Sequence, residues 1–157
     1  GSDVCSADLA GIRGCRELVD PLLAAQFSHV LLACGTGTTM TGLITSITTP
    51  VIGIQVLKGA GYLESEIHAQ LKRYDLKPLA PWQVLDDRHR GGYAKTDRVL
   101  SAFMARLAAD CAIPFEPVYS GKVLLALHEL ISAGYFTAGA KVLLVHGGGL
   151  QVLRAFP

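Results

Sequence analysis

A glycine- and threonine-rich stretch follows an apolar run in the first third of the chain. It reads Ala-Cys-Gly-Thr-Gly-Thr-Thr-Met-Thr-Gly over residues 33–42, directly after Val30, Leu31 and Leu32. Glycines let backbone N–H groups approach an anion closely, and threonine hydroxyls add further hydrogen-bond donors. The stretch can therefore bind a phosphate group, or it can simply turn a strand into a helix, and these residues alone leave both interpretations open.

The common nucleotide-binding loops match this stretch poorly. A P-loop needs a lysine near its end, but Gly37 is followed by Thr-Thr-Met-Thr-Gly. The dinucleotide-binding pattern G-x-G-x-x-G fails at its last position, which is Met40. Its acidic partner, expected about 20 residues further on, is also absent, because that interval ends at Gln55. A phosphate carried by another kind of cofactor fits better.

Apolar spacing along the chain predicts alternating strands and helices. Short apolar runs predict strands at residues 29–34, 51–57, 82–85 and 141–146. Apolar positions three and four residues apart predict helices at residues 7–25, 39–47, 62–74 and 120–133, a helix after the Thr96-Asp97 cap, and a short final helix after residue 149. In the first of these, Pro21 predicts a kink or an early end. This alternation predicts one α/β domain over residues 1–157, a three-layer sandwich with helices on both faces of a mostly parallel sheet.

In a sheet of this kind, ligands bind beyond the carboxyl ends of the strands, so residues directly after strands are informative. Three glycine- or hydroxyl-rich stretches lie there, at residues 35–39, 90–95 and 147–149. The apolar stripe after Asp97, which contains Leu100, Phe103, Met104 and Leu107, is instead predicted to be core.

Composition and charge exclude several classes of protein. Half of the residues are apolar and 17% are charged, against about 25% in a typical soluble domain. Two explanations of the low charged fraction remain open. Either the parallel strands are buried and apolar, or part of the surface packs against other protein. The net charge is +1 without a basic stripe, so we expect no nucleic-acid partner. No apolar run approaches the roughly 20 residues that span a membrane, and no signal segment opens the chain, so we expect a cytoplasmic protein without a membrane partner.

The cysteines and histidines predict no metal site. The four cysteines are widely spaced and form no C-x-x-C pair, and no histidine has a partner at metal-ligand spacing. We therefore expect reduced, structural cysteines. Gly1-Ser2 is typical of the remnant of a cleaved tag, so it receives no functional weight.

Four ordered stretches together resemble a known family. Besides residues 35–39, they are Gly-Gly-Tyr-Ala-Lys at 91–95, Pro-Val-Tyr-Ser-Gly-Lys at 117–122 and Val-His-Gly-Gly-Gly-Leu-Gln at 145–151. In this order the chain resembles the pyridoxal-phosphate enzymes that include 1-aminocyclopropane-1-carboxylate deaminase and D-cysteine desulfhydrase, which have the tryptophan-synthase-β-like (type II) fold. The resemblance runs from about residue 10 to residue 156 and implies the carboxy-terminal part of such an enzyme's large domain.

The resemblance implies a role for each matching residue. The phosphate of pyridoxal phosphate would be bound by Gly35, Thr36, Gly37, Thr38 and Thr39. Tyr93 and Tyr119 match active-site tyrosines that approach the substrate and take part in ring opening or proton movement. Ser120 matches a position near the pyridine nitrogen, where a hydroxyl would leave that nitrogen largely unprotonated. His146 and Gly147 match a stretch that forms a wall of the cofactor pocket, with His146 expected to be a structural, hydrogen-bonded residue.

Several departures from the family pattern bear on activity. Gly147 stands where desulfhydrase relatives usually have a threonine, and residues 5–11 match the family's G-G-S-N-x-x-G stretch badly. The lysine that forms the Schiff base in the family has no match here, since Lys95 and Lys122 are motif lysines at other positions. We therefore expect the chain alone to be inactive.

The resemblance leads to one functional hypothesis with one alternative. The full enzyme would release ammonia from a small amino acid, with a missing N-terminal segment or a second chain as partner and with a homo-oligomeric assembly. The alternative is a non-catalytic binding or assembly domain that docks a partner or another copy of itself through an exposed sheet.

Overall fold

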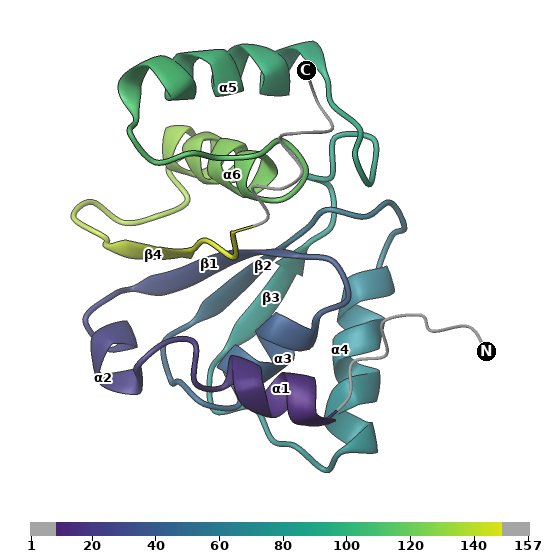
Figure 1. Cartoon of the computed structure of the whole chain (residues 1–157). Coiled ribbons are helices and arrows are strands. Elements are labelled where there is room, and N and C mark those ends of the chain that lie inside the picture. The colour runs from purple at the N-terminus through teal and green to yellow at the C-terminus, as the bar shows by residue number, and fades with distance from the viewer. Residues whose placement is uncertain (1–8, 149–157) are drawn as a thin grey trace.

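The protein is an α/β sandwich around a parallel sheet, and the computed structural model describes residues 9–148 (Figure 1). The four strands are β1 (His29–Cys34), β2 (Val51–Gln55), β3 (Trp82–Leu85) and β4 (Val142–Val145). The helices are α1 (Leu9–Cys15), α2 (Pro21–Ala24), α3 (Thr38–Ile44), α4 (Tyr62–Arg73), α5 (Arg98–Asp110) and α6 (Ser120–Ser132). The predicted α/β class is confirmed, and within the described residues every strand pair is parallel.

The strand order in the sheet is β3-β2-β1-β4. From β1 the chain moves outward through β2 to β3, then returns past β1 to place β4 at the opposite edge. The register pairs Leu31 with Ile52 on one side and with Leu144 on the other. The direction of winding therefore reverses between β1 and β4, and a reversal of this kind opens a crevice at the carboxyl ends of the two strands.

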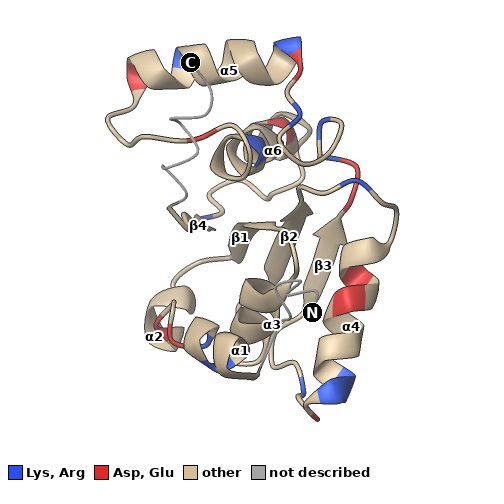
Figure 2. Cartoon of the chain, turned by 45° about the vertical axis from the view of Figure 1, so that its right-hand side comes forward, with Lys and Arg blue, Asp and Glu red and all other residues tan. Residues whose placement is uncertain are grey.

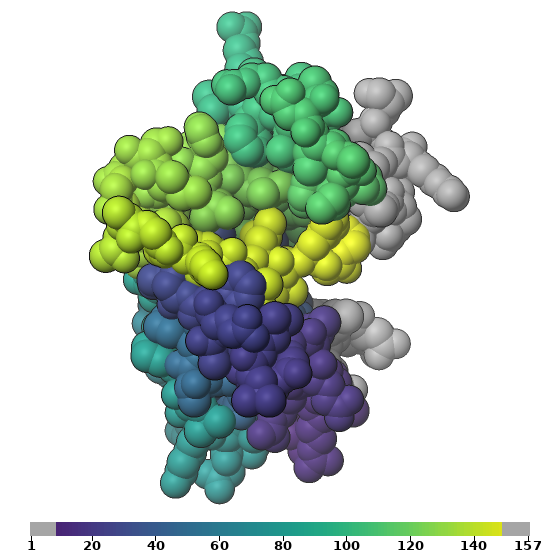
Figure 3. Space-filling view, turned by 90° about the vertical axis from the view of Figure 1, so that its left-hand side faces the viewer, coloured from purple at the N-terminus to yellow at the C-terminus, as the bar shows by residue number. Residues whose placement is uncertain are grey.

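The two faces of the sheet are covered by different helices. One core cluster joins β1 to α3 and α4 through side chains that include Leu32, Met40 and Ile67. The other joins the opposite face to α6 through Leu31, Ile52 and Val123. Helix α5 lies on the outer side of α6 and not on the sheet (Figure 1). Figure 3 shows β4 in yellow between α5 and α6 on one side and β1 on the other.

The strands are apolar because they are buried. None of the four contains Lys, Arg, Asp or Glu, and these residues lie on helices and loops instead (Figure 2). All five residues of β2 are buried, whereas β3 and β4, at the edges, are mostly half-buried. Burial of the central strands fits the first of the two explanations for the low charge content.

Several predicted element boundaries need correction. The helix predicted at residues 7–25 is two short helices, because the chain turns at Arg16–Leu18 and α2 begins at Pro21 with Asp20 as its N-cap. The stripe predicted as core in α5 has only Leu100 buried, since α5 packs on another helix. Strands β1 and β3 begin and end where predicted. The predicted final helix and Gly149 lie outside the described residues.

No helix within residues 9–148 combines the length and the apolar character that a membrane crossing requires.

Candidate ligand-binding cleft

A cleft of about 640 Å³ lies at the carboxyl ends of β1 and β4, where the winding of the sheet reverses. Its walls come from segments far apart in the chain: the end of β1 and the loop after it, the loop before α5, the start of α6 and the segment after β4. The lining residues are Leu32, Ala33, Gly35, Thr36, Thr39, Leu57, Tyr93, Glu116, Tyr119, Ser120, Val123, Val145, His146, Gly147 and Gly148. A cleft of this size holds a small-molecule ligand.

The 35–39 loop forms the floor of the cleft at the end of β1. Gly35, Thr36 and Thr39 line the cleft, and the Thr36 and Thr38 hydroxyls lie 3.2 Å apart. Gly37 has a φ of 83°, and a Cβ at this position would lie 2.9 Å from Cγ1 of Ile67 in α4. Gly37 therefore shapes the loop by packing against the core, and it does not line the cleft.

A glutamine from α4 holds the loop in place. The Gln70 amide donates to the Thr36 carbonyl oxygen at 2.8 Å, and its own oxygen accepts from the Thr41 hydroxyl at 2.7 Å. Gln70 is buried, so its bond with Thr41 is shielded from water, while its bond to Thr36 is partly buried. The shape of the loop therefore depends on a residue more than 30 positions further along the chain.

Two tyrosines face each other across the cleft. The rings of Tyr93 and Tyr119 meet edge to face, with centroids 6.2 Å apart. The Tyr119 ring also lies against the 35–39 loop, because a Cβ on Gly35 would lie 3.7 Å from Cε1 of Tyr119. Tyr93 is 56% exposed and lies at the rim. Burial raises the pKa of the Tyr119 hydroxyl, and Tyr93 and Glu116 raise it further, so Tyr119 keeps its proton at neutral pH.

The loop that carries Tyr93 is tied to α6 by buried and half-buried charges. The Lys122 ammonium group, only 1% exposed, donates to the Gly92 carbonyl oxygen at 2.6 Å. Arg88 and Arg90 both pair with Glu129 of α6, and Arg90 also lies 3.3 Å from Asp97. These contacts stabilise a loop in which four residues have a positive φ, namely Arg90, Gly91, Gly92 and Ala94.

The start of α6 is organised around a fully buried carboxylate. The side chain of Glu116 accepts hydrogen bonds from the backbone N–H groups of Val118, Tyr119 and Ser120. The hydroxyl of Ser120 also lies 3.0 Å from Oε1 of Glu116. This arrangement satisfies backbone donors that a helix start otherwise leaves free, and it fixes where Tyr119 and Ser120 point.

His146 forms part of the remaining wall and has partners at both ring nitrogens. Nδ1 accepts from the Gly148 N–H group at 3.2 Å, and Nε2 lies 3.0 Å from the Pro114 carbonyl oxygen. The ring stacks on Phe115 with centroids 5.1 Å apart. Because an N–H group only donates, Nδ1 is an acceptor and the proton sits on Nε2. His146 thus holds the 147–148 segment in place, as expected of a structural histidine.

The structure brings most of the predicted site residues together. Seven line the cleft: Gly35, Thr36, Thr39, Tyr93, Tyr119, Ser120 and Gly147. Gly37 and Thr38 instead border a hollow of about 40 Å³ within the 35–39 loop. Sequence reasoning missed Glu116, because capping patterns place the acidic residue at the N-cap or in the first turn, whereas Glu116 reaches the start of α6 from four residues before Ser120. Nothing in the spacing of Gln70 indicates its role, because its two partners lie on a different segment.

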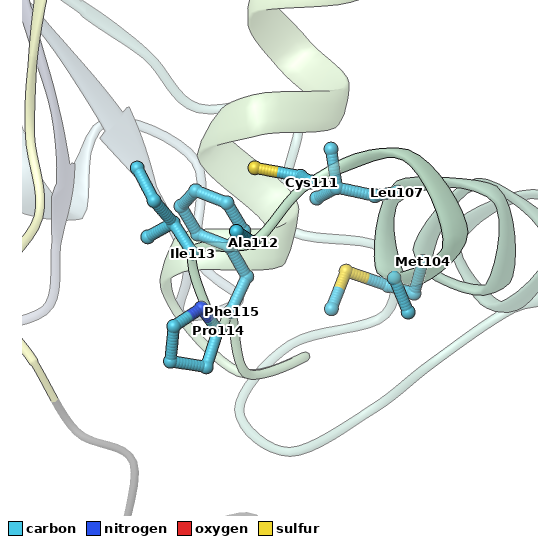
Figure 4. Close-up of a pocket in the computed structure, with 8 residues that line it drawn as sticks. Met104, Leu107, Cys111, Ala112, Ile113, Pro114 and Phe115 are labelled. Carbon is cyan, nitrogen blue, oxygen red and sulfur yellow. The ribbon is translucent and has the colours of Figure 1, made fainter.

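A second hollow, of about 380 Å³, lies between α5 and the segment that follows it (Figure 4). It is lined by Met104, Leu107, Ala108, Cys111, Ala112, Ile113, Pro114 and Phe115. These side chains offer no polar group apart from the Cys111 thiol. The hollow contains none of the predicted site residues, so we assign the ligand site to the larger cleft.

Fold and cleft together define a class: an α/β protein with a cleft at the switch point of a parallel sheet, lined by a glycine- and threonine-rich loop and two tyrosines. No family model matches the chain. A probable 1-aminocyclopropane-1-carboxylate deaminase of Cryptococcus neoformans var. neoformans serotype D is 36% identical over 74 residues, which cover 46% of this chain and 21% of the relative. A putative 1-aminocyclopropane-1-carboxylate deaminase of Thermotoga maritima is 26% identical over 149 residues, covering 88% of this chain and 46% of the relative.

A solved structure shares the fold of this chain. The crystal structure of a homologue of this deaminase superposes with a TM-score of 0.69 at 23% identity, over 92% of this chain and 47% of that one. The chain is thus similar in sequence to two proteins named as 1-aminocyclopropane-1-carboxylate deaminases, and it shares the fold of a solved homologue of that enzyme. The chain spans about half the length of the Thermotoga maritima relative, although the match covers most of the chain itself.

Proposed function

We propose that this chain forms the phosphate-binding part of a pyridoxal-phosphate-dependent enzyme that releases ammonia from a small amino acid, as a deaminase or desulfhydrase does. One observation carries the proposal: the 35–39 loop, the Tyr93–Tyr119 pair and Ser120 converge on one cleft at the switch point. The names of the relatives, all of the deaminase kind, support the same reaction class.

The residues of the cleft fit a flat ring that carries a phosphate. Gly35 leaves open the space between the loop and the Tyr119 ring, which a side chain would begin to fill. Thr36 and Thr39 line the same end of the cleft and offer hydroxyl groups beside the backbone N–H groups of the loop. Apolar contacts for the ring are available from Val123 and Leu57.

The cofactor, when bound, supplies an electron sink that stabilises negative charge on the substrate carbon. The protein's own residues would bind and orient it, with the 35–39 loop at the phosphate and His146 and Gly147 at the opposite wall. Tyr119 keeps its proton at neutral pH and can donate it to a substrate atom within the cleft. Tyr93, at the rim, would meet the substrate as it enters.

We further propose that the lysine that holds the cofactor covalently comes from protein outside this chain, either a further segment or a second chain. None of the residues that line the described cleft is a lysine. Two lysines, Lys58 and Lys122, stand next to lining residues in the sequence, and the Lys122 ammonium group donates to the Gly92 carbonyl oxygen. The chain by itself should therefore bind the cofactor reversibly without turning over substrate.

The first test is to titrate the chain with pyridoxal phosphate, record the visible spectrum, reduce with borohydride and measure the intact mass. Gly35→Asp places a carboxylate in the cleft, where ordinary contacts leave room for a Cβ, and should abolish saturable binding by repelling the phosphate. Gly14→Asp, in α1 with nothing within 4 Å of the new Cβ, is the matched control. Gly37→Asp is unsuitable because its Cβ would strike Ile67.

The outcomes separate the hypotheses. Saturable binding that only Gly35→Asp abolishes, without a stoichiometric lysine adduct, is the expected result. A stoichiometric adduct on one lysine would show that the chain holds its own covalent site. Absence of binding would contradict the proposal and favour a non-catalytic assembly domain.

A further inference from the structure

The fully buried carboxylate of Glu116 acts only as an acceptor. Oε2 accepts from the Val118 N–H group at 2.6 Å, Oε1 accepts from the Ser120 N–H group at 2.6 Å, and both oxygens lie 3.0 Å from the Tyr119 nitrogen. Backbone N–H groups can only donate, which fixes both oxygens as acceptors. Glu116 is 0% exposed, so water does not compete for these bonds.

This carboxylate determines what the hydroxyl of Ser120 can offer to a ligand. Oγ of Ser120 accepts from the Glu116 N–H group at 2.9 Å. Its two possible acceptors are the Glu116 carbonyl oxygen at 3.1 Å and Oε1 of the same residue at 3.0 Å. A serine hydroxyl has one proton and two lone pairs. The Ser120 hydroxyl therefore donates its proton to Glu116 and accepts from the Glu116 N–H group with one lone pair. The second lone pair stays available, so toward a ligand the hydroxyl can only accept a hydrogen bond.

Other charged groups nearby do not change this conclusion. Burial lowers the pKa of Lys122, while Glu116 and Asp97 act in the opposite direction, and the Lys122 ammonium group donates to the Gly92 carbonyl oxygen. The Tyr119 hydroxyl, with its raised pKa, is neutral. His146 has partners at both nitrogens, and Tyr93 lies at the rim. Within residues 9–148, the hydrogen bonds of the Ser120 hydroxyl go to Glu116 and to none of these groups.

We propose that Ser120 and Glu116 form an acceptor site that selects a protonated ring nitrogen, with Ser120 in contact with the ligand and Glu116 as a positioning residue. The inference rests on the proposed function, because the pyridine ring of the cofactor would supply that nitrogen. It reverses the expectation drawn from Ser120 alone, since an isolated hydroxyl can donate to an unprotonated nitrogen whereas this one cannot. Any other ligand group that faces Ser120 must likewise be a donor.

The test uses pyridoxine 5′-phosphate, which lacks the aldehyde and cannot be captured by a lysine. The ultraviolet absorption of its ring changes when the nitrogen titrates, so spectra of the bound probe across a pH series report the nitrogen directly. Inorganic phosphate serves as competitor and reports the phosphate site independently. In the unaltered chain we expect the pKa of the bound nitrogen to rise by about one unit or more, a tenfold preference for the protonated ring.

Variants at the two residues separate this site from the rest of the cleft. Ser120→Ala should return the nitrogen to the titration of the free probe, while phosphate competes as before. Ser120→Thr keeps the hydroxyl and should keep the shift. Glu116→Gln should lose the shift, because the amide brings a donor into the carboxylate's place. If Glu116→Gln does not fold, the two Ser120 variants decide, since the bonds from Glu116 to the backbone do not involve the hydroxyl.

Three outcomes would overturn the inference. Phosphate-competed binding with an unshifted nitrogen, or a shift that persists in Ser120→Ala, would contradict it and leave the proposed function intact. Failure of the unaltered chain to bind either the probe or inorganic phosphate would overturn the proposed function, and this inference with it.

Discussion

The ammonium group of Lys122 donates a 2.6 Å hydrogen bond to the carbonyl oxygen of Gly92 and so joins the first turn of α6 to the loop that carries Tyr93. The two residues are 30 positions apart in the chain. Tyr119 stands three residues before Lys122, and Tyr93 directly follows Gly92. A single buried bond therefore contributes to the edge-to-face placement of the two tyrosines.

Lys122→Met should loosen the Tyr93 loop. Methionine retains most of the apolar stem but has no donor, so the Gly92 carbonyl loses a charge-assisted bond that contributes about 1.5 kcal/mol or more. Amide exchange of residues 91–95 should then rise roughly tenfold by mass spectrometry or NMR. Lys72→Met, at an exposed site on α4, is the control and should leave exchange unchanged. Unchanged exchange in Lys122→Met would mean that the Arg88 and Arg90 pairs with Glu129 suffice to hold the loop.

Gly42→Ala should destabilise the protein strongly. A Cβ at Gly42 would lie 2.5 Å from Cβ of Cys15 and 2.8 Å from the backbone oxygen of Ile12, so α1 and α3 would have to separate. We expect a loss of about 1–3 kcal/mol in the free energy of unfolding, measured by urea denaturation. Gly14→Ala, in α1 with no atom within 4 Å of the new Cβ, should instead gain roughly 0.5–1 kcal/mol from helix propensity. Equal effects of the two substitutions would refute the close approach of these helices.

The stability of the protein should depend on pH through Asp97, the N-cap of α5. Its side chain accepts from the Leu100 N–H group at 2.7 Å and lies 3.3 Å from Arg90. The bond from Leu100, and then the charge of Arg90, hold the pKa of Asp97 below 3.8. Because the folded value is the lower one, the stabilisation is fully present above 3.8 and is lost as the pH falls through the folded value.

Asp97→Asn and Asp97→Ala separate the two contributions to this effect. Asparagine keeps the cap but cannot titrate, so Asp97→Asn should have a lower free energy of unfolding than the unaltered chain at neutral pH. This difference should shrink as the pH falls below about 4. Alanine removes the cap as well and should cost about 1 kcal/mol at neutral pH. A deficit of Asp97→Asn that stays constant from neutral to acidic pH would rule out the ionised cap.

Cys34 should be the least reactive of the cysteines that the structure describes. It follows Leu32 and Ala33 at the end of β1, directly before Gly35, yet its thiol faces Met40 in the core. Burial raises the pKa of Cys34 to about 12, so almost no thiolate is present at neutral pH. Alkylation followed by peptide mass spectrometry should label Cys15 and Cys111 first and Cys34 only after unfolding. Rapid labelling of Cys34 in the folded chain would show that the end of β1 opens.

The sequence predicted the strands better than the helix ends. A parallel strand with both faces buried is a short, continuous apolar run, and β1 and β3 begin and end where such runs do. The 7–25 prediction failed because Pro21 can begin a helix as readily as it ends one, and only the Asp20 cap shows which occurs here. The α5 stripe has helical spacing whether it faces a sheet or another helix, so periodicity could not show that most of it stays half-buried.

By itself the sequence determined the α/β class, the order of strands and helices, and the loops that follow the strands, because these depend on local spacing and on rules that hold for all parallel sheets. Only the tertiary structure decided which residues share the cleft. The return of the chain past β1 to β4 brings the 35–39 loop beside Tyr119 and Gly147. The tertiary structure also showed that Gly37 packs on α4, that Gln70 holds the loop and that the Ser120 hydroxyl lies 3.0 Å from Oε1 of Glu116. Such contacts join segments distant in sequence, and a hydrogen bond across that distance leaves no periodic pattern in the chain.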